Sequence, residues 1–223
     1  MPPLVDPVPS DQQLPNSTEV AIIGGGIIGV SAALTLAERG IPVALFEKGH
    51  IAGEQSSRNW GWCRQQGRDP RELPLIIESL ALWRKIHQRT RCDVGFRQCG
   101  ILYLANTSKD VADREAWLQH GLAYGVESRM VSSKEINELL PGSNEQWAGG
   151  LYTPTDGRAE PTIAAPAMAR AARQLGARIF TQTAVRGIET SGGRISAVIT
   201  EHGSVRCSTV ILAGGAWSST FCR

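Results

Sequence analysis

A strand–helix–strand pattern with three spaced glycines constrains the fold of this chain more than any other feature. The apolar run Thr18–Ile23 predicts a buried parallel strand that ends directly at Gly24. Apolar residues at helical spacing over 27–39 predict a helix that ends at Gly40, a residue type favoured after helix C-termini. A second strand is predicted over 42–46. Because two parallel strands joined by a helix form a βαβ unit, the chain is expected to open with one.

The glycines between the first strand and the helix fit the G-x-G-x-x-G pattern of dinucleotide-binding turns. Gly24 allows a tight turn, Gly26 lets a pyrophosphate approach the backbone, and Gly29 lets the helix pack closely on the strand. The N–H groups at the start of the helix, at Ile27 and Ile28, then favour the negative phosphates. A glycine-rich turn without a ligand is the disfavoured alternative, because strand, turn, helix and second strand occur together.

An acidic residue, Glu47, ends the second strand about twenty positions beyond the glycines. Its carboxylate is expected to accept hydrogen bonds from the ribose hydroxyls of an adenosine. The same charge would repel a 2′-phosphate, so NADP is disfavoured, whereas NAD and FAD both stay open. Lys48 follows and is expected at the cofactor, with a solvated loop cation as its alternative role.

The loop after this strand resembles the D-amino-acid-oxidase-like family of FAD-dependent oxidoreductases, which includes glycine and sarcosine oxidases and amino-acid deaminases or dehydrogenases. The matching stretch is EKGHIAGEQSSRNWG, residues 47–61. In that family an acidic strand end is followed by a glycine-containing stretch and by Ser/Thr pairs. The resemblance implies FAD as the cofactor. The implied contacts with the phosphate and ribityl region are Gln55, Ser56 and Ser57. Those along the flavin ring are Trp60, Gly61 and Trp62, although both tryptophans have core packing as an alternative role.

Two later segments are similar to the same family. Asp156-Gly157, an Ala-rich helix that opens at Pro161, and the stretch before Val185 resemble a returning segment of the family, which implies that the Val185 backbone contacts adenine. The stretch VILAGGAWS over 210–218 resembles the strand and turn beneath the cofactor. The contacts implied there are Ala213, Gly214 and Trp217. The resemblance spans residues 19–221.

The expected fold class is α/β: a Rossmann-like FAD-binding domain of the glutathione-reductase type, with part of an antiparallel-sheet α+β substrate domain. With 223 residues, 42% of them hydrophobic, the chain can bury a core. The expected parts are a disordered leader over 1–18, a discontinuous and incomplete FAD-binding domain over 19–95 and 155–223, and a partial substrate domain over 96–154. Between the second strand and residue 96, the pattern predicts a loop over 48–69 and one helix over 70–89.

The resemblance implies an enzyme that oxidises the C–N bond of an amino acid or related amine by hydride transfer to the flavin. No catalytic residue is assigned. Family members are longer, so the chain is expected to be truncated, or completed by a missing C-terminal segment or second subunit. The alternatives are an inactive cofactor-binding remnant or subunit, and an NAD-dependent dehydrogenase. The expected partner is a small amino acid or amine, and contact with an electron acceptor or a membrane surface stays open.

Charge and cysteine spacing argue against nucleic-acid binding and against a metal site. The net charge is +2 with no basic run, so nucleic acid is not an expected partner. The five cysteines have no metal-type spacing, and no metal site is predicted. The absence of a signal sequence favours a cytoplasmic location, with peripheral attachment at the inner face of a membrane left open.

Cys63 is either a reactive thiol or flavin attachment point or, as favoured, a small buried residue. The loop arginines have substrate-carboxylate binding or loop ordering as alternative roles; they are Arg58, Arg64 and Arg68.

Overall fold

The computed structural model describes residues 3–143 and 146–222. The chain divides into two compact units, each described here by itself. Unit 1 comprises Met1–Trp60, His87–Val94 and Glu160–Arg223, and unit 2 comprises Gly61–Ile86 and Gly95–Ala159. This division differs from the predicted boundaries, since 61–86, Gly95 and 155–159 fall in unit 2.

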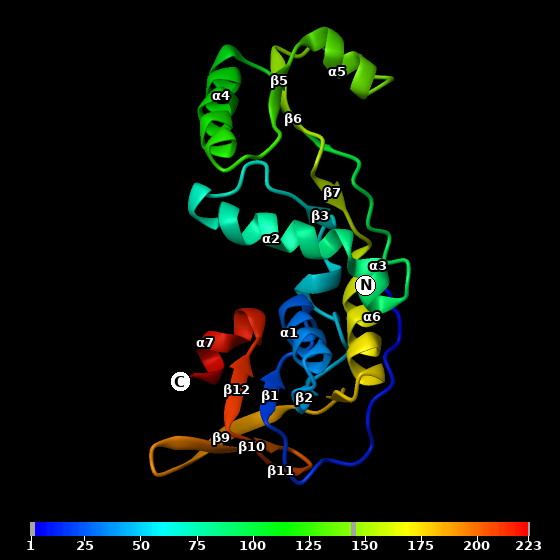
Figure 1. Cartoon of the computed structure of the whole chain (residues 1–223), viewed down its shortest axis with the longest axis vertical. Helices are drawn as coiled ribbons and strands as arrows, with labels where there is room; N and C mark the ends of the chain where they lie inside the picture. The colour runs from blue at the N-terminus through cyan, green and yellow to red at the C-terminus, as the bar shows by residue number, and fades with distance from the viewer. Residues whose placement is uncertain (1–2, 144–145, 223) are drawn as a thin grey trace. The chain divides into compact units, whose positions relative to one another are not determined.

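Unit 1 is built on a four-stranded parallel sheet with the strand order β12-β1-β2-β8. Its strands are β1 (Val20–Ile23), β2 (Val43–Phe46), β8 (Arg178–Phe180) and β12 (Thr209–Leu212). Every residue of β1 and β2 is buried, as expected for strands covered on both faces. The last strand in the sequence therefore lies beside the first (Figure 1).

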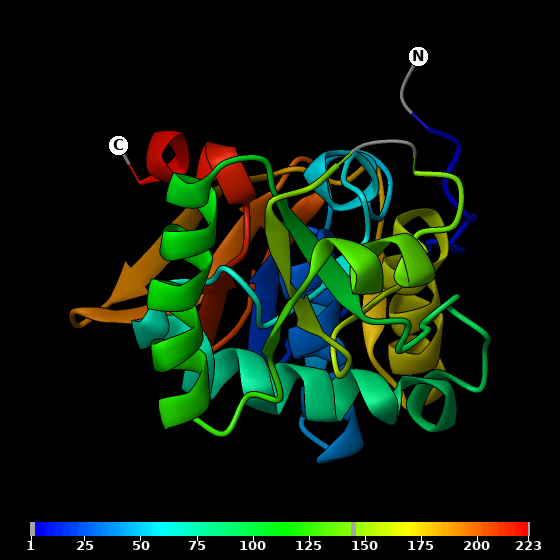
Figure 2. The ribbon, with the colours of Figure 1, turned by 90° about the horizontal axis from the view of Figure 1, so that it is seen from above.

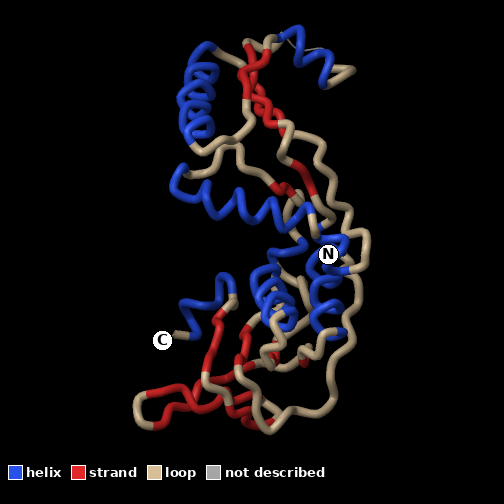
Figure 3. Tube along the Cα trace, in the orientation of Figure 1, coloured by secondary structure: helices blue, strands red, loops and turns tan. Residues whose placement is uncertain are grey.

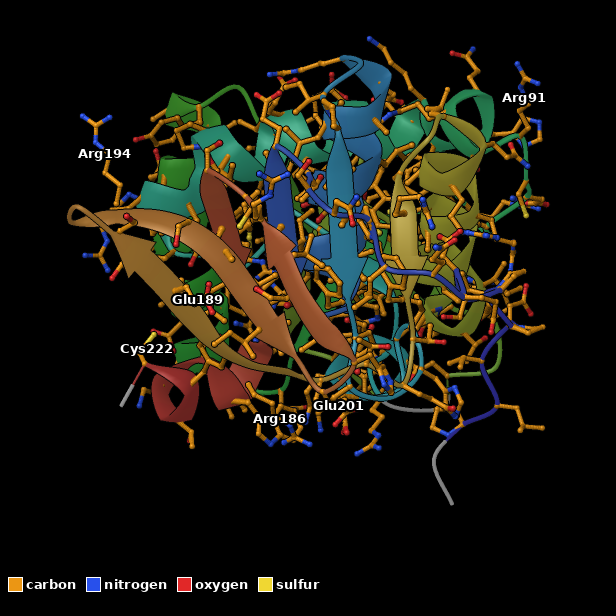
Figure 4. All side chains as sticks on the ribbon, turned by 90° about the horizontal axis from the view of Figure 1, so that it is seen from below. Arg91, Arg186, Glu189, Arg194, Glu201 and Cys222 are labelled. Carbon is orange, nitrogen blue, oxygen red and sulfur yellow. The ribbon has the colours of Figure 1, made fainter. Side chains whose placement is uncertain are left out.

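Two layers cover this sheet. Helices α1 (Ile27–Glu38) and α6 (Pro161–Gln174) pack against each other on one face (Figure 1). An antiparallel sheet of β9 (Val185–Ser191), β10 (Arg194–Thr200) and β11 (Gly203–Arg206) covers the other (Figure 4). Side chains of both sheets, including those of Ala21, Phe46, Val198 and Val205, form one buried cluster between them. The short elements of this unit are η1 (Gln55–Ser57), η3 (Gly215–Trp217) and α7 (Ser218–Phe221), and α3 (Ile86–Thr90) begins at its boundary.

The leader is ordered along the outer edge of β8. The Asp11 N–H donates to the Ile179 carbonyl at 2.8 Å, and the Ile179 N–H donates to Asp11 Oδ2 at 2.8 Å. The Thr181 N–H donates to Ser10 Oγ at 3.1 Å, and Leu14 packs on the core cluster. Figure 3 shows this segment as a loop that runs beside α6. The prediction of a disordered leader is wrong for residues 3–18, because these side chains satisfy the open strand edge; residues 1–2 lie outside the described part.

Unit 2 contains an antiparallel sheet with the strand order β4-β6-β5 and the short pair β3–β7. The strands are β3 (Trp62–Cys63), β4 (Ile101–Ala105), β5 (Arg129–Val131), β6 (Gly149–Thr153) and β7 (Gly157–Arg158). The helices are η2 (Pro70–Glu72), α2 (Leu73–Arg84), α4 (Ser108–Ala123) and α5 (Ser133–Leu139), and α4 and α5 both pack on the sheet (Figure 2). The pairing of Trp62 with Arg158, and one cluster of Cys63, Leu80 and Ala159, explain why 61–86 joins this unit.

The predicted fold class is confirmed: a Rossmann-like parallel sheet in unit 1 accompanies an antiparallel α+β arrangement in unit 2. Two local predictions were wrong. The single helix expected over 70–89 is divided, because α2 ends with Lys85 as its C-cap and α3 starts again at Ile86. The loop expected over 48–69 contains η1 and β3. Within the described residues, no helix is both long and apolar enough to span a bilayer.

Candidate functional site

A cavity lies at the carboxyl ends of β1, β2 and β12, entirely within unit 1. Its lining comes from residues within 23–26, 46–56, 184–186 and 212–221. Parallel α/β sheets bind ligands at this edge, because the strand ends and the helix N-termini meet there. The three strand ends bring together the glycine turn, Glu47 and the turn after β12.

The three motif glycines meet different surroundings. Gly24 has a φ of +111°, and a Cβ on it would lie 2.4 Å from the Ala213 carbonyl oxygen. A Cβ on Gly29 would lie 1.9 Å from the Gly24 carbonyl oxygen, so this glycine permits the contact between α1 and the strand end. A Cβ on Gly26 would meet one atom within 4 Å, Ser56 Oγ at 3.1 Å, and would otherwise point into the cavity. Gly26 therefore keeps space open for a ligand rather than for the protein.

Helix α1 begins at the cavity without a side-chain cap, because its N-cap residue is Gly26. The Ile27 N–H donates to Ser56 Oγ at 2.8 Å. The Ser56 hydroxyl keeps its own proton, which can be donated to a phosphate oxygen. The backbone N–H groups of the first helical turn and the helix dipole favour an anion at the same point. The Ile28 side chain itself is 69% exposed, so the backbone of this residue is what the helix start offers.

The Glu47 carboxylate is buried and accepts two backbone hydrogen bonds. The Gly25 N–H donates to Oε2 and the Gly49 N–H donates to Oε1, each at 2.7 Å. A carboxylate has about four acceptor positions, so each oxygen can still accept one hydroxyl proton. Two neighbouring ribose hydroxyls match this arrangement, and a 2′-phosphate would be repelled by the charge.

Apolar side chains form another part of the cavity wall. Phe46, Val185, Leu212 and Phe221 line it and also belong to, or pack on, the core cluster between the sheets. A flat aromatic base such as adenine fits an apolar wall of this kind. Val185, Ala213 and Gly214, which the sequence singled out, also line the cavity.

The structure brings most of the predicted site residues together, but not all of them. Gln55 and Ser56 line the cavity, whereas Ser57 is buried and its hydroxyl donates to the Glu54 carbonyl at 3.2 Å. This bond ties Ser57 to the 3-10 turn, so the side chain does not line the cavity. Trp60 is 81% exposed at the end of a unit 1 segment.

Gly61 and Trp62 belong to unit 2, and their contacts with a flavin ring stay predictions. Within unit 2, the Trp62 ring lies 6.1 Å from that of Tyr103, and the Arg64 guanidinium lies 5.6 Å from each ring. Arg64 also donates to the Gln66 carbonyl. This arrangement supports loop ordering as the role of Arg64.

The sequence analysis assigned no role to several of the lining residues, among them Ala184 and Arg186. Arg186 lies on β9 and pairs with Glu201 at 2.8 Å, while the Ala184 N–H donates to the other oxygen of Glu201 at 3.3 Å (Figure 4). Ala184 lies in the stretch before Val185 that resembles the family, whereas no motif marks Arg186. The signal that could have located them is the expected order of strands, which puts the residues before β9 near the end of β2.

Buried titratable groups occur in unit 2. Burial, and then the nearby Asp156 carboxylate, raise the pKa of the Cys63 thiol to about 12. Burial also raises the pKa of Asp156, although its carboxylate accepts hydrogen bonds from the backbone of Gln65 and Gln66. A thiol held this firmly in its protonated form is a poor nucleophile, which favours the buried structural role of Cys63. Among the residues that the structure describes, no group of three or more His, Cys, Asp or Glu side chains is placed to hold a metal ion.

Comparison with known proteins identifies a family and several relatives of this chain. Residues 19–223 match the family of FAD dependent oxidoreductases. Mitochondrial sarcosine dehydrogenase of Mus musculus is 30% identical over 223 residues, which cover 96% of this chain and 24% of that protein. Glycine oxidase of Geobacillus kaustophilus is 31% identical over 210 residues, which cover 90% of this chain and 55% of that protein.

Solved structures extend the likeness to three dimensions. The L-amino acid deaminase from Proteus myxofaciens, in complex with anthranilate, has a TM-score of 0.94 at 35% identity, over 98% of this chain and 50% of that one. The L-alpha-glycerophosphate oxidase from Mycoplasma pneumoniae, with FAD bound, has a TM-score of 0.81 at 27% identity. The chain therefore spans between 24% and 55% of the length of the relatives and of the deaminase structure.

Proposed function

The chain belongs to the family of FAD dependent oxidoreductases, and from this premise we propose that it supplies the FAD-binding part of an enzyme that oxidises the C–N bond of an amino acid or related amine. The observation that carries the proposal is the cavity at the strand ends, where the open space at Gly26 meets the Glu47 carboxylate and Ser56. The names of the relatives support the substrate class, since they include glycine oxidase, sarcosine dehydrogenase and an L-amino acid deaminase.

The residues present fit the adenosine diphosphate half of FAD. Glu47 has two free acceptor positions for the ribose, and the start of α1 with Ser56 suits the pyrophosphate. FAD, when bound, supplies the acceptor for the hydride that leaves the carbon next to the amine. The role of this chain is then to hold and orient the cofactor, which is the contribution that proteins make to flavin chemistry.

The remaining substrate determinants are proposed to lie in the parts of the relatives that this chain does not span. A missing C-terminal segment or a second subunit would supply them; one relative is named sarcosine oxidase subunit beta. We also propose that the complete protein binds an amino acid, passes electrons to an acceptor partner and is located in the cytoplasm.

Anaerobic mixing tests the substrate class. The FAD-loaded protein, together with any polypeptide that completes it, is mixed with glycine, sarcosine or L-amino acids, and the flavin colour is followed. We expect an amine to bleach the flavin and glycerol phosphate, the matched C–O substrate, to leave it oxidised. Bleaching by glycerol phosphate and by none of the amines would contradict the proposal.

A further inference from the structure

One rim of the cavity carries a chain of charges on the loop after β2. Lys48 Nζ lies 3.4 Å from Glu54 Oε1, and Arg58 Nη2 lies 3.3 Å from Glu54 Oε2. The Arg58 guanidinium also donates to the Gly53 carbonyl at 3.1 Å. These contacts connect Lys48 and Arg58 through the Glu54 carboxylate and join Arg58 to the backbone of the same loop.

Lys48 also reaches the opposite rim. Its Nζ lies 3.9 Å from the centre of the Trp217 ring, within the range of a cation–π interaction. Trp217 belongs to η3, directly after β12, and is 45% exposed, while the Lys48 side chain is 49% exposed. Both residues line the cavity.

The order of the strands shows how far this contact reaches across the sheet edge. Lys48 follows β2 and Trp217 follows β12, and β1 lies between these two strands. The strand ends are therefore about 10 Å apart, twice the spacing of neighbouring strands. The two side chains bridge this gap across the end of β1, where the turn Gly24–Gly26 begins. Both side chains line the same cavity as the glycine turn, so a ligand seated on that turn would lie next to this bridge.

We propose that Lys48 and Trp217 form a strap across the mouth of the cavity, which opens to admit the adenosine diphosphate half of FAD and, once closed, slows its release. The proposal rests on the proposed cofactor binding. It makes both residues positioning residues at the cavity mouth, whereas the sequence predicted separate cofactor contacts for each.

Dissociation rates of FAD test the strap. The full chain and its variants Lys48→Met, Trp217→Leu and the double variant are loaded with FAD and mixed with excess ADP, which occupies each emptied site, and the return of free-flavin fluorescence is timed. A half-exposed cation–π contact corresponds to about a two- to five-fold change in rate. Each single variant should release FAD faster by this factor, and the double variant should be no faster than the singles, because both lose the same contact. Association should not become slower.

Two controls keep the test independent of folding and of surface charge. Trp217→Phe retains a weaker aromatic partner and should fall between the wild type and Trp217→Leu. Lys109→Met removes an exposed lysine in α4 and should leave the rates unchanged. Without any cofactor, Lys48→Met should alter the part of the tryptophan emission that Trp217→Phe removes.

The outcomes separate the strap from the binding site itself. If the wild-type chain binds FAD but the single variants release it at the wild-type rate, the strap is refuted and the cofactor site stands. If Lys48→Met slows association, more so at low salt, while Trp217→Leu changes nothing, Lys48 is a direct phosphate contact and the strap is again refuted. Failure of the wild-type chain to bind FAD would overturn the strap and the proposed function together.

Discussion

Glycines that share one motif serve different partners in this structure. A Cβ on Gly24 or Gly29 would collide with backbone oxygen atoms, at 2.4 Å and 1.9 Å. A Cβ on Gly26 would touch only Ser56 Oγ, at 3.1 Å, and the backbone of Gly26 has a φ of −74° that alanine can adopt. The protein needs Gly24 and Gly29 for its own packing, and the ligand needs Gly26 for space.

Two alanine substitutions test this distinction. Gly29→Ala is expected to destabilise the protein by about 1–3 kcal/mol, because the new methyl group overpacks the contact between α1 and β1. Gly26→Ala is expected to leave thermal unfolding of the apoprotein near the wild-type value and to weaken FAD binding by about tenfold or more, since the pyrophosphate must move away from the backbone. Thermal unfolding without cofactor and titration with FAD measure both effects. Equal destabilisation by the two variants would contradict the assignment.

Glu47 is the residue expected to distinguish ADP from its 2′-phosphate. Glu47→Gln removes the charge and one acceptor, and hydrogen bonds to charged groups contribute about 1.5–3 kcal/mol, so ADP should bind about ten- to a hundred-fold more weakly. Discrimination against 2′-phospho-ADP should shrink in the same variant. Calorimetric titration with both nucleotides measures this. The matched control is Glu189→Gln on the exposed surface of β9, which should bind both as the wild type does (Figure 4). Unchanged discrimination in Glu47→Gln would count against the ribose contact.

At the scale of elements, the leader completes one edge of the parallel sheet. The leader covers the outer edge of β8, and Asp11 joins the Ile179 N–H, Arg173 and Arg178. Burial alone would raise the pKa of Asp11, but the hydrogen bonds from Arg173 and Ile179 outweigh it and hold the pKa below its usual value. Because the folded state then binds fewer protons, Asp11 stabilises it above the usual pKa of 3.8, and this contribution is lost as the pH falls through the lower folded pKa.

The variant Asp11→Asn tests the role of the leader. It is expected to lower the free energy of unfolding by about 1–2 kcal/mol at neutral pH, where Asp11 carries its charge, and to have a smaller effect below pH 3.8. Denaturant unfolding at the two pH values measures the difference, and hydrogen exchange of the Ile179 and Thr181 amides locates it. A variant as stable as the wild type at neutral pH would show that the Asp11 carboxylate contributes nothing to the sheet edge.

The sequence predicted those parts of the fold that depend on local patterns. Gly24, Gly26, Gly29 and Glu47 follow from short-range spacing, and the first strand, helix and second strand follow with them. The leader on β8 and the contact between Lys48 and Trp217 join residues more than a hundred positions apart, which no local pattern records. The break between α2 and α3 also escaped, because the apolar spacing continues through it while the backbone does not.

At the scale of the whole molecule, the cavity is made by segments from both ends of the sequence. The first βαβ unit supplies the glycine turn and Glu47, and the last strand returns beside β1 to supply the turn 213–217. The chain thus contains the strand ends that form the proposed cofactor site, although it spans only part of the length of its relatives. Cofactor binding is therefore the property that this chain can be tested for by itself.

The most direct test of this account is a calorimetric titration of the purified chain with FAD, ADP, NAD and NADP. We expect FAD to bind with one site per chain, ADP to compete with it, and Gly26→Ala to weaken both. NADP should not compete, because Glu47 repels its 2′-phosphate. Binding of NAD in the absence of FAD binding, or no binding of either FAD or ADP, would contradict the assignment of this cavity to the adenosine diphosphate half of FAD.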